Sequence, residues 1–130
     1  MANRMFKPLG GSLTQEVVCL TGKWTFHASD GTVASSDLTG FSVATVGTDG
    51  VQVITLEDAY NSILGVHITY EDASHEADET TGFELASETV ATTKLITLQH
   101  YAEDDGDEQV RGKIGGKTLH CMIWLKNSSV

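Results

Sequence analysis

The chain has 130 residues, enough for one domain with a single core, and its 18 acidic and eight basic residues give a formal net charge of −10. A chain this acidic repels phosphate backbones, which argues against a nucleic-acid partner. No stretch approaches the roughly 20 apolar residues of a membrane span, and the first residues lack the apolar core of a signal peptide. We therefore expect a soluble protein that is made in a cytoplasm and has no membrane partner.

The charge is unevenly spread along the chain. Residues 30–108 hold seventeen acids and one base, Lys94, whereas the remainder holds seven bases and one acid, Glu16. A solvated acidic surface is the simplest interpretation of the middle segment. The sharper interpretation is that the basic ends contact an acidic partner while the acidic middle faces solvent.

The first segment differs from the rest of the chain. Residues 1–13 show no regular alternation and carry Arg4 and Lys7 without any acid. A frayed tail is one interpretation, but the apolar side chains around Phe6 are unusual for a tail that contacts only water. We expect an N-terminal arm over 1–13 that orders on assembly, with Arg4, Phe6 and Lys7 as partner-binding residues. A single domain would then cover 14–130.

Alternation with a period of two predicts strands along most of that domain, joined by short turns. Gly22, inside the first run, suggests a bulge or the close approach of another segment, and Asp49-Gly50 suits a hairpin turn. Residues 57–61 suit a single helical turn. The expected strands are 17–27, 40–46, 51–56, 63–70, 83–90, 94–101 and 118–126. Seven or eight short strands with little helix predict an all-β fold, an antiparallel β-sandwich or jelly roll.

The same alternation assigns one face of each strand to the core. The expected core residues are Val18, Leu20, Trp24, Phe26, Phe41, Val43, Val53, Leu64, Val66, Ile68, Leu95, Leu119, Cys121, Ile123 and Leu125. Burial in a core or an interface is also the favoured interpretation of Trp124, with a sugar-binding surface formed by the two tryptophans as the alternative. Cys19 and Cys121 lie in the first and last strong strands, so a disulfide between them stays open if those strands are neighbours.

Motifs that would carry chemistry are few. The acidic segments 75–79 and 103–108 lack the alternate register of a calcium loop, so solvated loops are the simpler interpretation and weak Ca²⁺ binding is the alternative. The five histidines do not pair with each other or with a cysteine at zinc-ligand spacing. Nucleophile-elbow, phosphate-loop and dinucleotide motifs are absent from the sequence. We expect no enzyme activity and no catalytic, metal or cofactor residues; a small hydrolase with an acid pair is a minor alternative.

Scaffold motifs in a fixed order give the chain a resemblance. They are Met1-Ala2-Asn3-Arg4, Gly11-Ser12-Leu13, Glu16-Val17-Val18, Gly40-Phe41-Ser42-Val43, Val53-Ile54-Thr55-Leu56, Asp58-Ala59-Tyr60, Leu64-Gly65-Val66 and the closing residues 125–130. Together they resemble a group of small virion proteins of tailed bacteriophages; the resemblance covers most of the chain and thins out between 71 and 112. The resemblance implies a decoration (cement) protein of the virion that binds the major capsid protein and associates with itself as a dimer or trimer. A tail-fibre or tail-tip module that binds a host receptor or glycan is the alternative.

Overall fold

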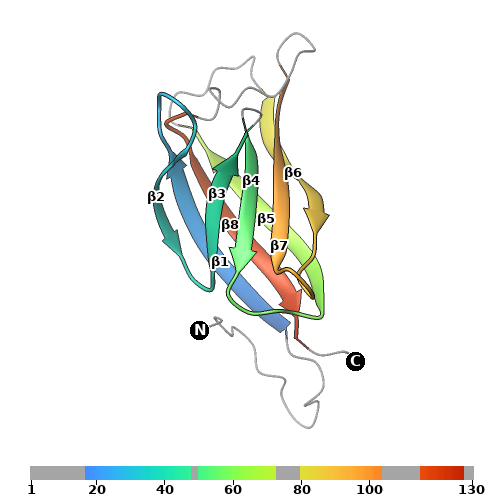
Figure 1. Cartoon of the computed structure of the whole chain (residues 1–130). Coiled ribbons are helices and arrows are strands. Elements are labelled where there is room, and N and C mark those ends of the chain that lie inside the picture. Colours follow the sequence, from blue (N-terminus) through green and yellow to red (C-terminus); the bar gives the residue numbers. More distant parts are fainter. Residues whose placement is uncertain (1–16, 48–49, 73–79, 104–114, 128–130) are drawn as a thin grey trace.

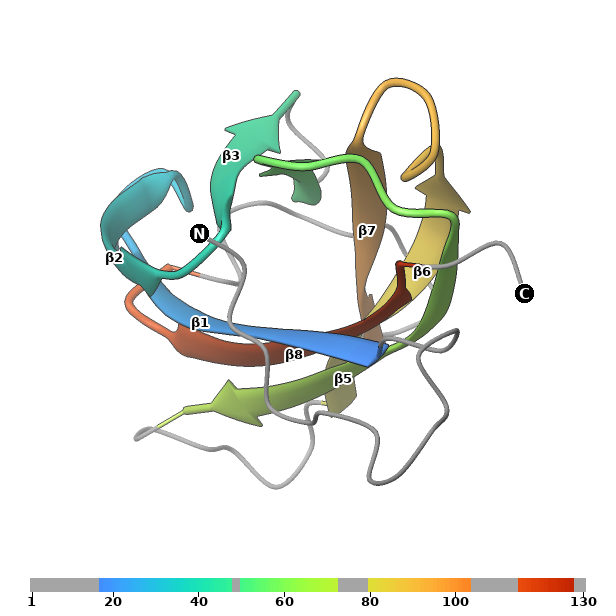
Figure 2. The ribbon, with the colours of Figure 1, turned by 90° about the horizontal axis from the view of Figure 1, so that it is seen from below.

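The computed structural model of the chain describes residues 17–47, 50–72, 80–103 and 115–127. They form two four-stranded antiparallel sheets that face each other (Figures 1 and 2). The strands are β1 (Val17–Phe26), β2 (Val33–Leu38), β3 (Phe41–Val46), β4 (Val51–Leu56), β5 (Ser62–Glu71), β6 (Thr80–Glu88), β7 (Leu95–Glu103) and β8 (Thr118–Lys126). The expected all-β sandwich is therefore confirmed.

The helical turn expected over 57–61 is wrong, because this segment connects β4 to β5 without forming a helix. Its backbone is fixed instead by hydrogen bonds to other segments: the amide of Tyr60 donates to the carbonyl of Val90, and the amide of Asn61 donates to that of Lys126. Tyr60 is buried in the core. Burial of its ring holds the connection across the end of the sandwich.

The first sheet has the strand order β2-β1-β8-β5, and the second has the order β3-β4-β7-β6. The first and last strands are therefore hydrogen-bonded neighbours, in a register that runs from Val17 opposite Lys126 to Thr25 opposite Thr118. Both strands place polar residues, such as Lys23 and His120, on the face opposite to their buried apolar residues, which favours one buried and one outward face. As a result, the chain enters and leaves the described domain at the same end of this sheet (Figure 1).

Strand β2 was not expected from the sequence. It is short and mostly exposed, and it pairs with β1 at the edge of the first sheet. Only its end residues, Val33 and Leu38, pack against the core. The residues between them are small or polar, so the sequence shows no apolar alternation here. A short, polar edge strand of this kind discourages pairing with other chains.

The core fills the space between the sheets. Its fully or nearly fully buried apolar residues are Val18, Leu20, Trp24, Phe26, Phe41, Ile54, Leu56, Tyr60, Val90, Ile96, Leu98, Leu119, Cys121, Ile123 and Leu125. Cys19 is buried too, but on the other face of β1. Of the other expected core residues, Val43, Val66 and Ile68 are partly buried against this cluster. The predicted inner faces of β1 and β8 are confirmed throughout.

Two strands of the second sheet have the opposite face inward from the one expected. Val53 and Leu95 were expected in the core, but both are only partly buried and lie outside the core cluster. The inward residues are Gln52, Ile54 and Leu56 on β4 and Ile96, Leu98 and His100 on β7. Both faces of these strands carry apolar residues, so alternation alone did not distinguish them.

Leu64 on β5 is also wrongly assigned to the core, for a different reason. The pairing of β5 with β8 shifts between Ile63 and Gly65, which is a β-bulge. The bulge turns Ile63 toward the core cluster and leaves Leu64 55% exposed. Beyond the bulge, Val66 and Ile68 face inward as expected.

The close approach suggested at Gly22 is confirmed. A Cβ atom at this inward position of β1 would lie 2.7 Å from both Leu38 Cδ2 and Phe41 Cζ. The absence of a side chain thus lets the end of β2 and the start of β3 pack onto the centre of the first sheet.

Candidate functional site

The outward face of the first sheet holds a polar depression of about 460 Å³. All four strands and the turn after β2 contribute to it, which places its side chains on a rigid, hydrogen-bonded base. Its walls carry hydroxyl, imidazole, ammonium and carboxylate groups. The side chains that line it are those of Thr21, Lys23, Asp37, Thr39, His67, Thr69, His120 and Met122, with Gly22 and Cys121 beneath them.

The strand register explains why these groups meet. Lys23 of β1 lies opposite Asp37 on one side and His120 on the other. His67 of β5 lies opposite Met122, so the two histidines are diagonal neighbours on adjoining strands. Diagonal neighbours on one face lie within reach of each other's long side chains. No spacing motif in the sequence marks this pair, because β5 and β8 are far apart along the chain.

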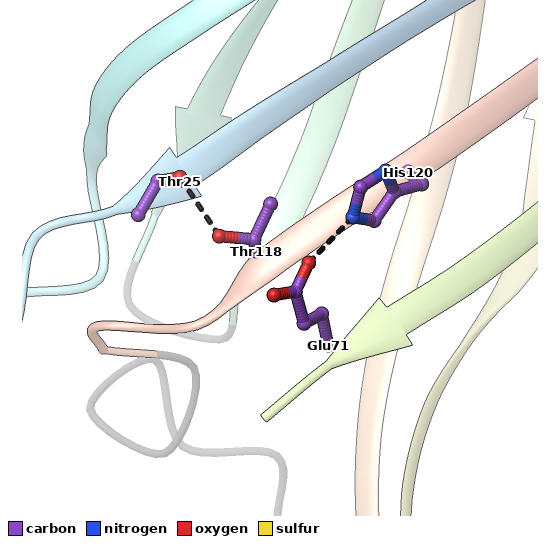
Figure 3. A network of polar contacts seen from close by, with 4 residues as sticks. All are labelled: Thr25, Glu71, Thr118 and His120. Atoms are coloured by element: carbon purple, nitrogen blue, oxygen red, sulfur yellow. Dashed lines mark hydrogen bonds and ion pairs between the residues drawn. The ribbon is translucent and has the colours of Figure 1, made fainter. Parts of the chain in front are cut away.

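Two hydrogen bonds fix one end of this face (Figure 3). Nε2 of His120 lies 2.7 Å from Oε2 of Glu71, and the hydroxyls of Thr25 and Thr118 lie 2.8 Å apart. The side chains of His120 and Glu71 are 44% and 64% exposed. They therefore remain accessible to a ligand that donates or accepts hydrogen bonds.

A partly buried ion pair closes the same end of the sheet. Nζ of Lys117 lies 2.9 Å from Oδ2 of Asp72, with side chains only 12% and 16% exposed. The same ammonium lies 5.7 Å from the centre of the Tyr70 ring, within the range of a cation–π contact. This pair holds the last residues of β5 against the start of β8.

The two cysteines are free thiols on opposite faces of the first sheet. Cys121 faces the core opposite Gly22, three positions along β1 from Cys19. Three residues of extended strand span about 10 Å, too far for a disulfide. Burial raises the pKa of both thiols; for Cys121, burial and then the charge of Cys19 raise the pKa to about 12.

The two tryptophans occupy different environments. Trp24 is 1% exposed in the core and meets Phe41 edge to face, with ring centres 6.5 Å apart. Trp124 is partly buried on the outward side of β8, opposite Cys19 on β1 and Gly65 on β5. Only Trp124 can therefore contribute to a binding surface, and it lies on the same face as the depression.

The outward face of the second sheet is very different. It carries valine, alanine, leucine, threonine, serine, glutamine and tyrosine, and among the side chains that the structure describes its one charged residue is Glu84 on the edge strand β6. We call it the uncharged face and define it by Ser42, Ala44, Val46, Val51, Val53, Thr55, Leu95, Thr97, Gln99 and Tyr101. Sequence reasoning missed this surface because it placed Val53 and Leu95 inside.

The partner-binding residues expected from the sequence, Arg4, Phe6 and Lys7, lie outside the described residues, as do residues 75–79 and 104–108. Among the residues that the structure does describe, no three His, Cys, Asp or Glu side chains come together as metal ligands would. The described strands and turns also include no helix that could span a membrane. No protein-family model, curated protein or solved structure matches the chain.

Proposed function

We propose that this chain is a structural protein of a tailed-bacteriophage virion, a decoration protein that binds the outside of the major capsid shell. The ordered motifs that resemble such proteins run from the first residues to the last. The observation that carries the proposal is the pairing of β1 with β8. It joins the two basic ends of the sequence into one sheet, so a single side of the domain can approach an acidic shell.

The distribution of lysines supports this orientation. Lys23 and Lys126 both lie on the outward face of the first sheet. They are two of the four lysines in the described part of the chain. Charged groups at the rim of an interface steer its partner and set the docking register. In this proposal the first sheet faces the shell.

The N-terminal arm would provide the second attachment. Residues 1–16 join the domain at Val17, which lies opposite Lys126 at the end of the sheet. Phe6 would anchor the arm in an apolar site on the shell, while Arg4 and Lys7 pair with shell carboxylates. Because ordering the arm costs conformational entropy, it would add affinity only once the domain is docked.

The test uses particles that lack the protein and measures how much of it rebinds. Deleting residues 2–10 should lower occupancy at both low and high salt. A Phe6→Ala variant should lower it at both salt concentrations, whereas Arg4→Ala with Lys7→Ala should matter mainly at low salt, where charge interactions are least screened. Full occupancy of the deletion variant would reject the arm. A virion content of only a few copies, measured by gel densitometry, would reject decoration itself.

The polar depression favours a second candidate, a tail-tip module that binds a host glycan. Sugars are recognised by hydrogen-bonding groups at fixed positions beside an apolar surface, and the depression has such groups beside Met122 and near Trp124. Binding to host polysaccharide that is lost in His120→Ala and Trp124→Ala, but kept in Ser42→Ala on the other sheet, would support this function. Equal binding by all three variants would reject it.

A further inference from the structure

The uncharged face defined above exposes apolar side chains over three adjacent strands of the second sheet. Val46 is 50% exposed and Tyr101 is 42% exposed. Val51, Val53 and Leu95 between them are partly exposed. These side chains form a continuous surface, because Val46 pairs with Val51 and the strands β3, β4 and β7 are hydrogen-bonded in that order.

Tyr101 extends this surface toward the edge of the sheet. Its ring lies across Gly82 of β6, where a Cβ atom would come within 2.7 Å of the ring carbon Cζ. An aromatic ring over a strand glycine covers backbone that would otherwise be open to solvent. The ring therefore continues the apolar surface from β7 onto β6.

The absence of charge on this face is unusual for such an acidic chain. The outward positions of its four strands carry one ionisable acid, Glu84, among the described side chains, although the whole chain has a net charge of −10. The outward face of the first sheet, by contrast, carries Lys23, Asp37, Glu71 and Lys126. Because the chain has a net charge of −10, contact between two copies through a surface rich in acids would bring like charges together.

We infer that the uncharged face is where two copies of this chain associate, sheet against sheet about a two-fold axis. Two copies meeting there bury apolar area and, of the acids whose side chains the structure describes, bring the two Glu84 carboxylates into the interface region, at its edges. A two-fold interface uses the same patch on both subunits, and a patch without charge of either sign can face itself. Sheets commonly pack in this way, about 10 Å apart, with side chains of the facing surfaces interdigitated.

The area of the uncharged face determines how strong a dimer we expect. Three strands spaced about 4.8 Å apart and six to nine residues long cover roughly 300–400 Å² per copy. Interfaces of this size belong to the small, transient class. We therefore expect a weak dimer in dilute solution that becomes populated where copies are concentrated, as on a shared surface. The inference rests on exposure and charge alone and does not depend on the proposed function.

The test compares matched substitutions on the two sheets. Ser42 and Ser35 are exposed, outward-facing serines on the edge strands β3 and β2, and Thr55 is an exposed threonine within the uncharged face. Sedimentation velocity of the full chain, over concentrations from micromolar to millimolar, gives the dimer dissociation constant. We expect Ser42→Asp and Thr55→Asp to raise this constant at least tenfold, because each dimer then buries or confronts two new carboxylates. Ser35→Asp, with the same change in net charge, should leave it within twofold.

Salt provides a second readout that needs no variant. Screening weakens the repulsion between two copies of net charge −10, so added NaCl should tighten the dimer. An interface held by ion pairs would weaken instead, which would overturn the inference. The inference also fails if the wild-type chain stays monomeric up to millimolar concentration, or if Ser35→Asp weakens the dimer as much as Thr55→Asp. A dimer that is lost on deleting residues 2–13 but keeps its strength in Thr55→Asp would assign association to the arm.

Discussion

The outward faces of the two sheets differ in composition, although the two sheets share one core. The first sheet presents threonine, histidine, lysine and carboxylate side chains around a depression. The second presents valine, leucine, alanine and tyrosine together with serine, threonine and glutamine, and the described side chains include one acid, at its edge. Solvent alone does not require a face like the second one, since an exposed strand position tolerates polar residues readily. The difference indicates that the two faces meet different surroundings.

The largest expected change in the free energy of unfolding comes from substituting neighbouring residues of β7. Ile96 is fully buried, so Ile96→Ala should lower the free energy of unfolding by about 2–5 kcal/mol, as Ile123→Ala should in the first sheet. Leu95 lies on the uncharged face, and Leu95→Ala should cost about 0.5 kcal/mol. Urea denaturation measures all three. A larger loss for Leu95→Ala than for Ile96→Ala would mean that the strand has its other face inward.

The same contrast explains which buried faces could be predicted from the sequence and which could not. Alternation identified the buried faces of β1 and β8, because lysine, histidine and threonine mark their other faces, although these also carry valine, cysteine, methionine and tryptophan. On β4, the sequence Val-Gln-Val-Ile-Thr-Leu offers Val51 and Val53 on one face and Ile54 and Leu56 on the other. Gln52 made the true inward face look polar. Its amide is satisfied inside by the hydroxyl of Thr45 and the carbonyl of Gly50.

The candidate site was beyond sequence reasoning for a related reason. Its histidines, His67 and His120, come together only because β5 pairs with β8 across the sheet. That pairing is set by the arrangement of the whole sandwich, which no local pattern encodes. The bulge that exposes Leu64 is likewise a property of the paired strands. Alternation predicts which residues share a face, but it does not predict which strands are neighbours.

Cys121, on the inner side of the first sheet, should make the stability of the fold depend on pH. The pKa of Cys121 is about 12 in the folded protein, against an ordinary value of 9.0. The folded state thus keeps a proton that the unfolded state releases, so this contribution to stability is fully present below pH 9 and is lost as the pH rises toward 12. The loss is on the order of 1.4 kcal/mol per pH unit in that window.

The measurement is the slope of unfolding free energy against pH between 9 and 12. Cys121→Ala should reduce this slope, whatever it does to stability at pH 7, because the titrating group is gone. Other groups contribute equally to both slopes, so the difference between the two slopes is the quantity of interest. Identical slopes would show that Cys121 is not the group responsible.

Alanine substitutions at two glycines also contrast the inward and outward positions of the first sheet, with smaller expected effects on stability. At Gly22, on the inward side of β1, a methyl group would collide with Leu38 and Phe41, so Gly22→Ala should cost about 1–3 kcal/mol through overpacking. At Gly65, just beyond the bulge and opposite Trp124, a Cβ atom has no neighbour within 4 Å. Gly65→Ala should therefore stabilise the strand by about 0.5 kcal/mol. Thermal denaturation of both variants checks the opposite signs; a destabilised Gly65→Ala protein would show that its outward position is not open.

The smallest expected changes in stability distinguish the two polar pairs at one end of the first sheet, Asp72–Lys117 and Glu71–His120. Asp72 and Lys117 are largely shielded from water, so Asp72→Asn should cost about 1–2 kcal/mol, because a charge-assisted hydrogen bond is lost and an ammonium is left partly buried. Glu71 is mostly exposed, and Glu71→Gln should cost no more than about 0.5 kcal/mol.

Urea denaturation at 0.05 M and 1 M NaCl measures both variants. At 1 M salt the screening length falls to about 3 Å, so any cost of Glu71→Gln should vanish, whereas most of the cost of Asp72→Asn should persist. The two pairs would then have different roles: Asp72 and Lys117 hold β5 to β8, while Glu71 and His120 contribute little to stability and are available to a ligand. A Glu71→Gln protein that loses more than 1 kcal/mol at either salt concentration would instead make that pair structural.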